Sequence, residues 1–328
     1  MRAQKKERLV DLRPRRTVTY AGLPHLRSPG VNAWVSVMRG CDRFCTYCVV
    51  PYTRGRERSL PAECVLEEVR RAVSEGFVSV TLLGQTVTAY RDEGRDLAWL
   101  LQEVARIEGL LRIRFLAPYP GQITERLVGV MATEPKVCKH VHLPLQSGSD
   151  RVLEAMHRGY TSSEFVDLVD RMRAAVPGLA VTTDLMVGFP GETEEDYDAT
   201  LSVMRRLRFD GAFMFAYSER PGTAAARRMK DDVPREVKRA RLEKLIALQE
   251  SHSLERFEAF LGKTVEVLVE SEARKPQGWF YGRSDDFRDV IFRPLEGEDL
   301  RAGVLVSVLI EEASAHTLKG RQVPAAGT

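Results

Sequence analysis

The feature of the sequence that most constrains its fold is a sixfold alternation of short, apolar, β-branched segments with longer segments of helical period. Strands are predicted at residues 34–38, 78–83, 112–116, 140–143, 181–187 and 212–217, and helices at 64–74, 97–107, 124–131, 149–156, 163–175 and 194–207. Such units pack as parallel strands joined by right-handed crossovers. Because eight units close a full barrel, six predict an α/β fold with a partial (β/α)6 barrel, open on one side to a large substrate.

The pattern changes after this region. Residues 234–260 form one long charged segment of helical period. Its apolar side is expected to carry Leu242, Leu245, Leu248 and Leu254. From Val265 onward, apolar and polar residues alternate with period two, which predicts a small all-β barrel of a kind that binds nucleic acid. We therefore expect three parts: a basic linker at 1–29, a core with a long C-terminal helix at 30–260, and a β-barrel at 261–324.

Three of the five cysteines lie close together, at Cys41, Cys45 and Cys48, directly after the first predicted strand. This spacing is typical of a metal site in a reducing cytosol and not of a disulfide framework. Barrel-like folds place their active sites on loops at the carboxyl ends of strands. The remaining two, Cys64 and Cys138, stand alone in the sequence and are expected to pack in the core.

Three thiolates suit a four-iron cluster with one iron left open, because such a cluster needs four ligands. The amino and carboxylate groups of S-adenosylmethionine (SAM) can chelate the open iron, and an electron from the cluster can then cleave SAM to a 5′-deoxyadenosyl radical. The difficult chemistry belongs to the cofactor, and the protein positions it. The alternative is a zinc site, which usually needs paired C-x2-C units and four ligands.

Polar or glycine-rich residues follow three further strands at the same rim. Taken singly each is a weak signal, since glycine after a strand usually makes a turn. Together they predict a cofactor pocket formed by Gly84, Gln85, Gln146, Ser147, Asp184 and Gly188.

The C-x3-C-x2-C spacing, with Tyr47 before the last cysteine, resembles the signature of the radical SAM superfamily. A closer resemblance, to the tRNA methylthiotransferases of the MiaB type, runs from about Ala33 to Gln322, and the C-terminal barrel is similar to the TRAM domain of that family. The motifs that carry it are at 48–59, 82–85, 143–149, 186–195 and 217–223.

The resemblance implies a function. The family attaches a methylthio group to carbon 2 of an isopentenylated adenosine beside the tRNA anticodon. One SAM donates a methyl group to sulfur, and another gives the radical that abstracts the ring hydrogen. The resemblance also implies a [4Fe-4S] cluster, tRNA as partner, an electron donor such as a flavodoxin or ferredoxin, and contact of Tyr47 with the adenine of SAM through its backbone.

The sequence departs from the family at its start. Family members carry an N-terminal domain with three more cysteines, which hold a second [4Fe-4S] cluster that delivers the sulfur, whereas no cysteine precedes Cys41 here. We expect that this chain alone cleaves SAM and binds RNA without completing methylthiolation. A smaller departure is Thr86, where the family usually has Asn.

The charge is distributed unevenly. The net charge is +3, but residues 1–60 carry 13 Lys/Arg against 4 Asp/Glu. A basic front end suggests a polyanionic partner such as RNA. Arg54, Arg56 and Arg58 lie just beyond the cysteines and are expected to bind phosphates, the alternative for Arg54 or Arg58 being that it pairs with an internal carboxylate.

Other interpretations stay open at this point. Residues 262–322 carry nine Lys/Arg against eleven Asp/Glu, so the barrel could meet a basic partner, as in the related methylthiotransferases that act on a ribosomal protein. A non-catalytic RNA-binding module with a structural metal is a further alternative. No apolar run of about 18 residues predicts a membrane span, and no secretory signal is seen, so we expect a cytoplasmic monomer.

Overall fold

The computed structural model describes residues 27–324, so most of the predicted basic linker lies outside the described residues. Six parallel strands form two three-stranded sheets, which an isolated parallel bridge between Ile113 and Val137 joins. The strands follow one another in chain order across both sheets: β1 (Asn32–Ser36), β4 (Ser79–Leu83), β7 (Arg112–Phe115), β8 (His140–His142), β9 (Ala180–Val187) and β10 (Gly211–Ala216). The predicted partial barrel is confirmed, with β1 and β10 as its edges.

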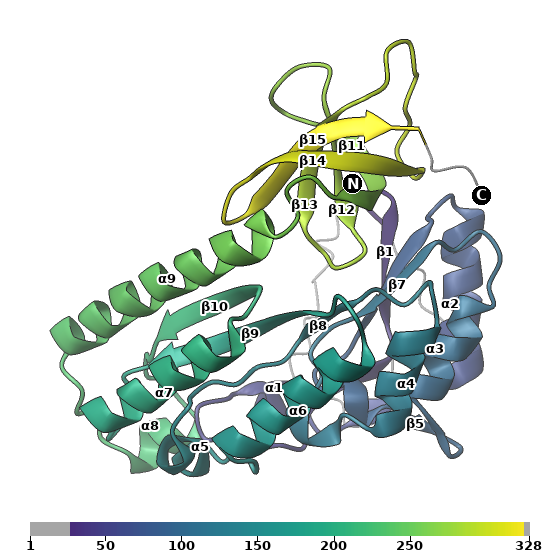
Figure 1. Ribbon diagram of the computed structural model, residues 1–328. Coiled ribbons are helices and arrows are strands. Elements are labelled where there is room, and N and C mark those ends of the chain that lie inside the picture. Colours follow the sequence, from purple (N-terminus) through teal and green to yellow (C-terminus); the bar gives the residue numbers. More distant parts are fainter. Residues whose placement is uncertain (1–26, 325–328) are drawn as a thin grey trace, which may run out of the picture.

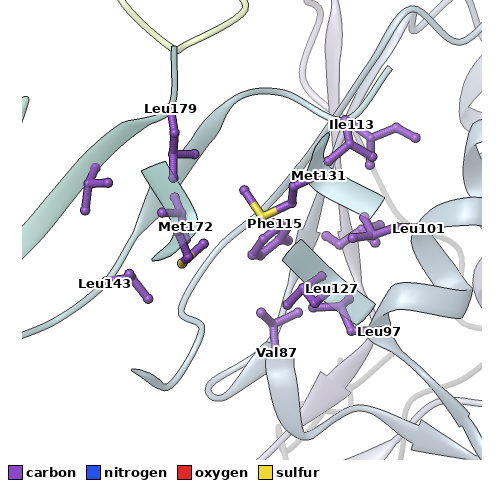
Figure 2. Packing of buried hydrophobic residues seen from close by; sticks show 14 of the residues in the cluster. Val87, Leu97, Leu101, Ile113, Phe115, Leu127, Met131, Leu143, Met172 and Leu179 are labelled. Atoms are coloured by element: carbon purple, nitrogen blue, oxygen red, sulfur yellow. The ribbon is translucent and has the colours of Figure 1, made fainter. Parts of the chain in front are cut away.

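Helices cover the outer face of these strands (Figure 1). They are α2 (Ala62–Ser74), α3 (Leu97–Ala105), α4 (Glu125–Thr133), α6 (Ser162–Ala175) and α7 (Glu194–Leu207). The short helix α5 (Asp150–Ala155) packs instead against the segment after Cys45, where the Thr46 hydroxyl donates to the Ala155 carbonyl. Thr161 and Thr193 begin α6 and α7 with capping boxes, in which side chains satisfy the free backbone donors of the first turn. Phe115 of β7 packs with helix residues such as Leu101 and Met131 in the main core, part of which Figure 2 shows.

The strands alternate between two environments. On β1, Ala33 and Val35 are buried in the core under the helices, whereas Trp34 between them points to the other, inner face and is largely exposed. Side chains of β9 and β10 alternate in the same way. The inner face therefore lines the hollow side of the partial barrel, while the outer face holds the core.

The two isolated cysteines differ in burial. Cys138 is buried just before β8, as the sequence predicted. Cys64 lies in the first turn of α2 and is exposed, so its predicted place in the core is wrong. The helix buries the neighbouring positions Val65 and Leu66 instead, and this turns Cys64 toward solvent.

The long helix is present as α9 (Arg235–Glu258), but its predicted apolar side is wrong at one end. Leu245 is fully buried, whereas Leu254 is 38% exposed. The buried face of the helix carries a residue at nearly every third or fourth position, and most of these residues are polar. They are Lys238, Arg241, Leu245, Gln249, His252, Ser253 and Phe257. Leucine spacing alone misplaced the face because polar residues with internal partners occupy much of it.

The C-terminal unit is a closed barrel of five strands in the order β11-β12-β13-β15-β14. The strands are β11 (Thr264–Glu272), β12 (Phe280–Ser284), β13 (Asp289–Arg293), β14 (Leu305–Ala313) and β15 (Thr317–Val323). This barrel lies at the amino ends of the six parallel strands, opposite α1 (Val50–Arg54) (Figure 1). Two arginines of β7 fix it there, because Arg112 donates to the carbonyl of Arg283 and Arg114 to that of Ser284.

A buried carboxylate strengthens the same junction. Asp210 accepts hydrogen bonds from Arg256 of α9 and from Arg288 of the β12–β13 turn, and it also accepts from the backbone of Val181. Charge-assisted bonds of this kind are stronger than neutral ones. Asp210 thus links the core, the long helix and the C-terminal barrel. Within residues 27–324 no helix is long and apolar enough to cross a membrane.

Candidate functional site

The three clustered cysteines lie on a loop that a short antiparallel pair closes at its base. β2 (Met38–Arg39) pairs with β3 (Arg58–Ser59), so that residues 40–57 form an excursion at the carboxyl end of β1. Cys41 and Cys48 are partly exposed and Cys45 is buried. The turn is held by the hydrogen bond from Cys48 N–H to the Cys45 carbonyl at 2.9 Å.

Glycine is required at the start of this loop. Gly40 has a φ of +81°, and a Cβ there would lie 2.0 Å from the carbonyl oxygen of Arg56. Its N–H donates to the side-chain oxygen of Gln85 at 2.6 Å. The next residue, Cys41, donates from its N–H to the Gly55 carbonyl at 3.1 Å. The two arms of the loop therefore approach more closely than any side chain allows.

Each of the three sulfurs accepts a hydrogen bond. Cys41 Sγ accepts from the Thr86 hydroxyl at 3.1 Å, and Cys48 Sγ accepts from the Val50 N–H at 3.4 Å. Cys45 Sγ accepts from the guanidinium of Arg158 at 3.3 Å. Donors aimed at sulfur stabilise thiolates and tune the potential of iron–sulfur clusters.

The donor set fits a cluster better than a single ion. Burial raises the pKa of the Cys48 thiol, and its neighbours Cys45 and Cys41 raise it further, so the three groups are close enough to interact. Yet among residues 27–324 no three His, Cys, Asp or Glu side chains converge closely enough to hold one metal ion. A four-iron cluster needs four ligands, so three thiolates on one loop would hold it with one iron left open. The zinc alternative also lacks a fourth nearby ligand in the described residues.

Arg158 is the residue that the sequence analysis missed and that the structure places at the centre of the site. It is buried, and besides Cys45 it donates to the Tyr47 hydroxyl at 3.3 Å and to the Pro144 carbonyl at 2.9 Å. Burial raises the pKa of Tyr47. No local signal marked Arg158, because it lies 113 positions from Cys45 along the chain.

Four of the predicted pocket residues follow the strands β4 and β8, and they differ in their contacts. Gly84 and Gln85 follow β4 beside the cysteine loop, and the side-chain oxygen of Gln85 accepts the hydrogen bond from the Gly40 N–H. Gln146 bridges to β9, since its N–H donates to the Asp184 carbonyl at 2.8 Å. The side chain of Ser147, by contrast, is fully buried against Thr200 of α7. The whole residue, backbone included, has no exposed surface, so Ser147 does not line an open pocket.

On the inner wall of β8–β10, the imidazole of His142 and the carboxylate of Asp184 lie in contact. Their side chains are 3.3 Å apart. The ring of His142 also meets the edge of Phe213 at a centroid distance of 5.8 Å. His142 and Asp184 therefore lie on the hollow side of the partial barrel, beside the ring of Phe213.

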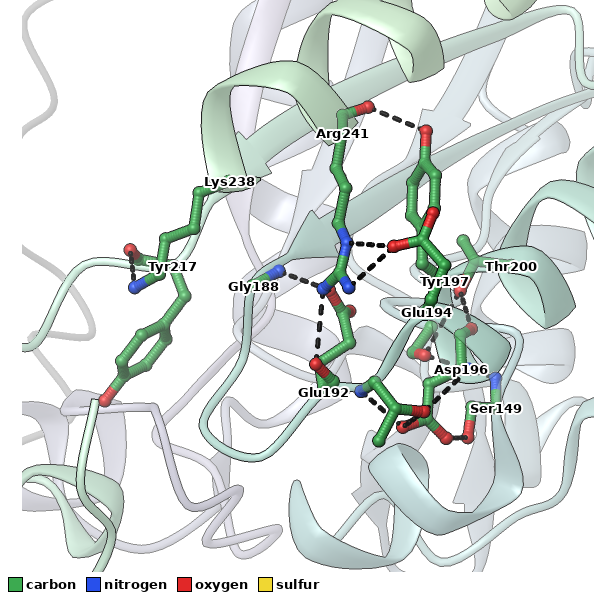
Figure 3. A network of polar contacts seen from close by, with 12 residues as sticks. Ser149, Gly188, Glu192, Glu194, Asp196, Tyr197, Thr200, Tyr217, Lys238 and Arg241 are labelled. Atoms are coloured by element: carbon green, nitrogen blue, oxygen red, sulfur yellow. Dashed lines mark hydrogen bonds and ion pairs between the residues drawn. The ribbon is translucent and has the colours of Figure 1, made fainter. Parts of the chain in front are cut away.

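Gly188 begins a loop that a buried ion pair holds (Figure 3). The Gly188 N–H donates to Glu192 at 2.6 Å, and Glu192 pairs with Arg241 of α9 at 2.8 Å. Burial raises the pKa of Glu192, while the Gly188 N–H and Arg241 oppose that shift. A Cβ at Gly188 would lie 2.3 Å from Lys238, so the helix packs directly on the loop.

The three predicted phosphate-binding arginines lie beside the cysteine loop. Arg54 is exposed at the end of α1. Arg56 is exposed, pairs with Asp42 at 2.6 Å and lies over the ring of Phe44. Arg58 donates to the Arg54 carbonyl at 3.0 Å. Arg56 thus has a carboxylate partner at the surface, and its side chain stays open to solvent.

Comparisons with known proteins agree with this geometry. The family model of the radical SAM superfamily matches residues 35–204. The chain is 49% identical to the tRNA-2-methylthio-N(6)-dimethylallyladenosine synthase of Prosthecochloris aestuarii, over 92% of this chain and 68% of the relative. It is 45% identical to the protein of the same name from Carboxydothermus hydrogenoformans, over 97% of this chain and 72% of the relative.

Solved structures show the same fold. Coproporphyrinogen III oxidase from Escherichia coli, a radical SAM enzyme, superimposes with a TM-score of 0.51 at 16% identity, over 68% of this chain and 53% of that one. The radical SAM methyltransferase TsrM from Kitasatospora setae, with cobalamin and a [4Fe-4S] cluster bound, gives a TM-score of 0.51 at 19% identity, over 60% of this chain and 39% of that one.

Proposed function

The chain belongs to the radical SAM superfamily, in the family of the tRNA-2-methylthio-N(6)-dimethylallyladenosine synthases, and we propose that it binds tRNA and directs radical chemistry to carbon 2 of a dimethylallylated adenosine beside the anticodon. One observation carries the proposal. Cys41, Cys45 and Cys48 share one loop at the carboxyl end of β1, and each sulfur accepts a hydrogen bond.

The residues of the cysteine loop and those around it would have different roles. The three cysteines would hold the [4Fe-4S] cluster that the superfamily uses. When bound, the cluster supplies the electron that cleaves SAM to a carbon radical. Gly40 and Gln85 fix the shape of the cysteine loop, and Arg158 places a positive charge beside Cys45. The protein thereby supplies position and electrostatics, as in other cofactor enzymes.

We further propose that SAM lies against the rim formed by Tyr47, Gly84, Gln85, Gln146, Ser147, Asp184 and Gly188. Support comes from their position at the carboxyl ends of β1, β4, β8 and β9, on the side of the cysteine loop. Ser147 would support this rim from below, because the whole residue is buried. A low-potential one-electron donor such as a flavodoxin or ferredoxin would reduce the cluster, and the enzyme would act in the cytoplasm as a monomer.

RNA recognition is proposed for Arg54, Arg56 and Arg58, with the C-terminal barrel as a second contact. The guanidinium of Arg293 lies over the ring of Trp279, and Arg321 is its register partner on β15. An arginine next to an accessible aromatic ring is a common way to hold single-stranded RNA, and Trp279 is partly exposed. Glu311, however, pairs with both Arg293 and Arg321, so this face is only partly basic.

The test is anaerobic iron reconstitution followed by two measurements on the full chain. Formation of 5′-deoxyadenosine from SAM reports the radical chemistry. Binding of an anticodon stem-loop RNA, measured against salt, reports the partner, and a ribosomal protein serves as competitor. In Arg54→Glu/Arg56→Glu the salt slope should fall by about one for each phosphate that the variant no longer neutralises. Arg70→Glu on the exposed face of α2 is the matched control. Unchanged RNA binding by the double variant would remove these arginines from the interface.

A further inference from the structure

The two edge strands of the open barrel carry exposed aromatic side chains on their inner faces. On β1, Trp34 is 59% exposed, and on β10, Phe213 and Phe215 are 63% and 51% exposed. Phe213 lies in register with Asp184 and Phe215 with Met186, both of which are inner-face residues of β9. Large apolar side chains left open together mark a binding surface more often than a random feature of the exterior.

This aromatic lining, Trp34 with Phe213 and Phe215, lies on the same hollow side as the cysteine loop. Met186, the register partner of Phe215, and Tyr47 of that loop both pack against one buried apolar cluster, which includes Phe189 and Tyr217. Phe213 in turn contacts the His142 ring. The lining therefore extends from the cysteine loop along the inner wall toward the amino ends of the strands.

The C-terminal barrel closes the far end of the hollow. Phe287, at the turn between β12 and β13, lies against His140 at a centroid distance of 4.9 Å and under the guanidinium of Arg114 at 4.6 Å. Cavities remain beside it. One of about 320 Å³ reaches Trp34, and one of about 500 Å³ reaches Phe213. Both volumes exceed what a short branched hydrocarbon needs.

The chemistry of the proposed substrate indicates which of its groups binds to the aromatic lining. Carbon 2 of the target adenine must face the radical source at the cysteine loop. The substituent on N6 leaves the ring in a different direction, so it is carried away from that loop and along the inner wall. The dimethylallyl group has five carbons and no polar atom, and hence gains free energy only from apolar surface.

We propose that Phe213 and Phe215, with Trp34 across the opening, form the specificity site for the dimethylallyl substituent of the target nucleoside. The inference rests on the proposed function and deepens it, since it explains which residues tell a dimethylallylated adenosine from an unmodified one. These aromatic rings are exposed in the free protein, and the dimethylallyl group would cover them on binding. Discrimination by an apolar pocket grows with each buried carbon.

The experiment compares two synthetic anticodon stem-loop RNAs that differ only in the dimethylallyl group. Their dissociation constants are measured by fluorescence anisotropy with the reconstituted full chain. Wild type should prefer the modified RNA by about tenfold or more. In Phe213→Ala/Phe215→Ala this ratio should fall toward one. Leu254→Ala is the matched control, because Leu254 is an exposed apolar residue on α9, outside the lining, and the ratio should stay at the wild-type value.

The outcomes separate the inference from the function on which it rests. A double variant that keeps the wild-type ratio, or a wild type that binds both RNAs equally, would overturn the inference and leave tRNA binding in place. A wild type that binds neither RNA would overturn the proposed function, and the specificity site with it. Circular dichroism and iron content show whether the variants are folded, and Trp34→Ala provides a second, independent reduction of the ratio.

Discussion

The guanidinium of Arg158 donates a hydrogen bond to Cys45 Sγ at 3.3 Å from a buried position. Arg158 follows α5 and the cysteine loop follows β2, so the contact joins two distant parts of the chain at the predicted cluster. The same guanidinium holds the Pro144 carbonyl at 2.9 Å, which ties the loop after β8 to the cysteine loop. Arg158 is therefore a positioning residue for the cluster ligands.

A positive donor beside a thiolate favours the reduced, more negative form of a cluster. Replacing Arg158 with Leu should therefore shift the reduction potential of the reconstituted cluster to more negative values, and Arg158→Lys should shift it less. A redox titration followed by electron paramagnetic resonance measures both. An unchanged potential in Arg158→Leu at full iron content would show that the contact has no electrostatic role.

Two glycines of the cysteine loop form a matched pair. Gly40 and Gly55 have φ values of +81° and +79°, but a Cβ would meet the Arg56 carbonyl at 2.0 Å in the first and nothing closer than 3.9 Å in the second. Gly55→Ala should cost about 1–3 kcal/mol of unfolding free energy from backbone strain alone, because a φ of +79° with a ψ of −165° is a conformation that essentially only glycine adopts. Gly40→Ala should cost more and should also lower the iron bound on reconstitution. Chemical denaturation and iron assays check this, and equal effects of the two changes would contradict it.

The buried ion pair of Arg241 and Glu192 leads us to predict that breaking it lowers the stability of the protein by an amount that depends on pH. Arg241→Met leaves the Glu192 carboxylate without its partner and should destabilise the protein by about 3–5 kcal/mol near neutral pH. Burial already holds the pKa of Glu192 above its usual value. The folded state then binds more protons than the unfolded state, so the loss should shrink as the pH falls and Glu192 becomes protonated. Unfolding at pH 7.5 and 5.5 tests this, and a loss independent of pH would argue against it.

The contribution of His140 to stability should change with pH in the opposite direction. Burial lowers its pKa from 6.5 to about 3. Between these values the unfolded state binds the proton and the folded state does not, so stability falls as the pH drops below 6.5. At one pH unit below 6.5 the cost is about 1.4 kcal/mol. The difference in stability between wild type and His140→Gln should change by about that amount from pH 7.5 to 5.5. A constant difference would contradict this, because it would show that His140 has the same pKa in the folded and unfolded states.

Much of the fold could be predicted because hydrophobic period and turn residues act locally. The predicted strand at 181–187, for example, differs from β9 (Ala180–Val187) by one residue. The position of the C-terminal barrel could not be predicted, since it depends on Arg112 and Arg114 donating to carbonyls about 170 residues away. Arginines in a predicted strand gave no sign of such partners.

The site shows the same division. The cysteine triad was evident because its ligands are contiguous and their spacing is distinctive. Arg158 was missed because its partners are remote in sequence. Ser147 was named as a pocket residue, yet its side chain is buried against Thr200. A polar residue after a strand does not reveal toward which side it points, and only packing decides that.

The central claim is that three thiolates hold a cluster that cleaves SAM, and the most direct measurement replaces each cysteine in turn. Iron content and 5′-deoxyadenosine release are assayed after anaerobic reconstitution of Cys41→Ala, Cys45→Ala and Cys48→Ala, with Cys64→Ala, an exposed cysteine on α2, as the control. We predict that each triad variant loses both iron and nucleoside release while Cys64→Ala keeps both. A triad variant that retains its iron and still releases the nucleoside would contradict the claim.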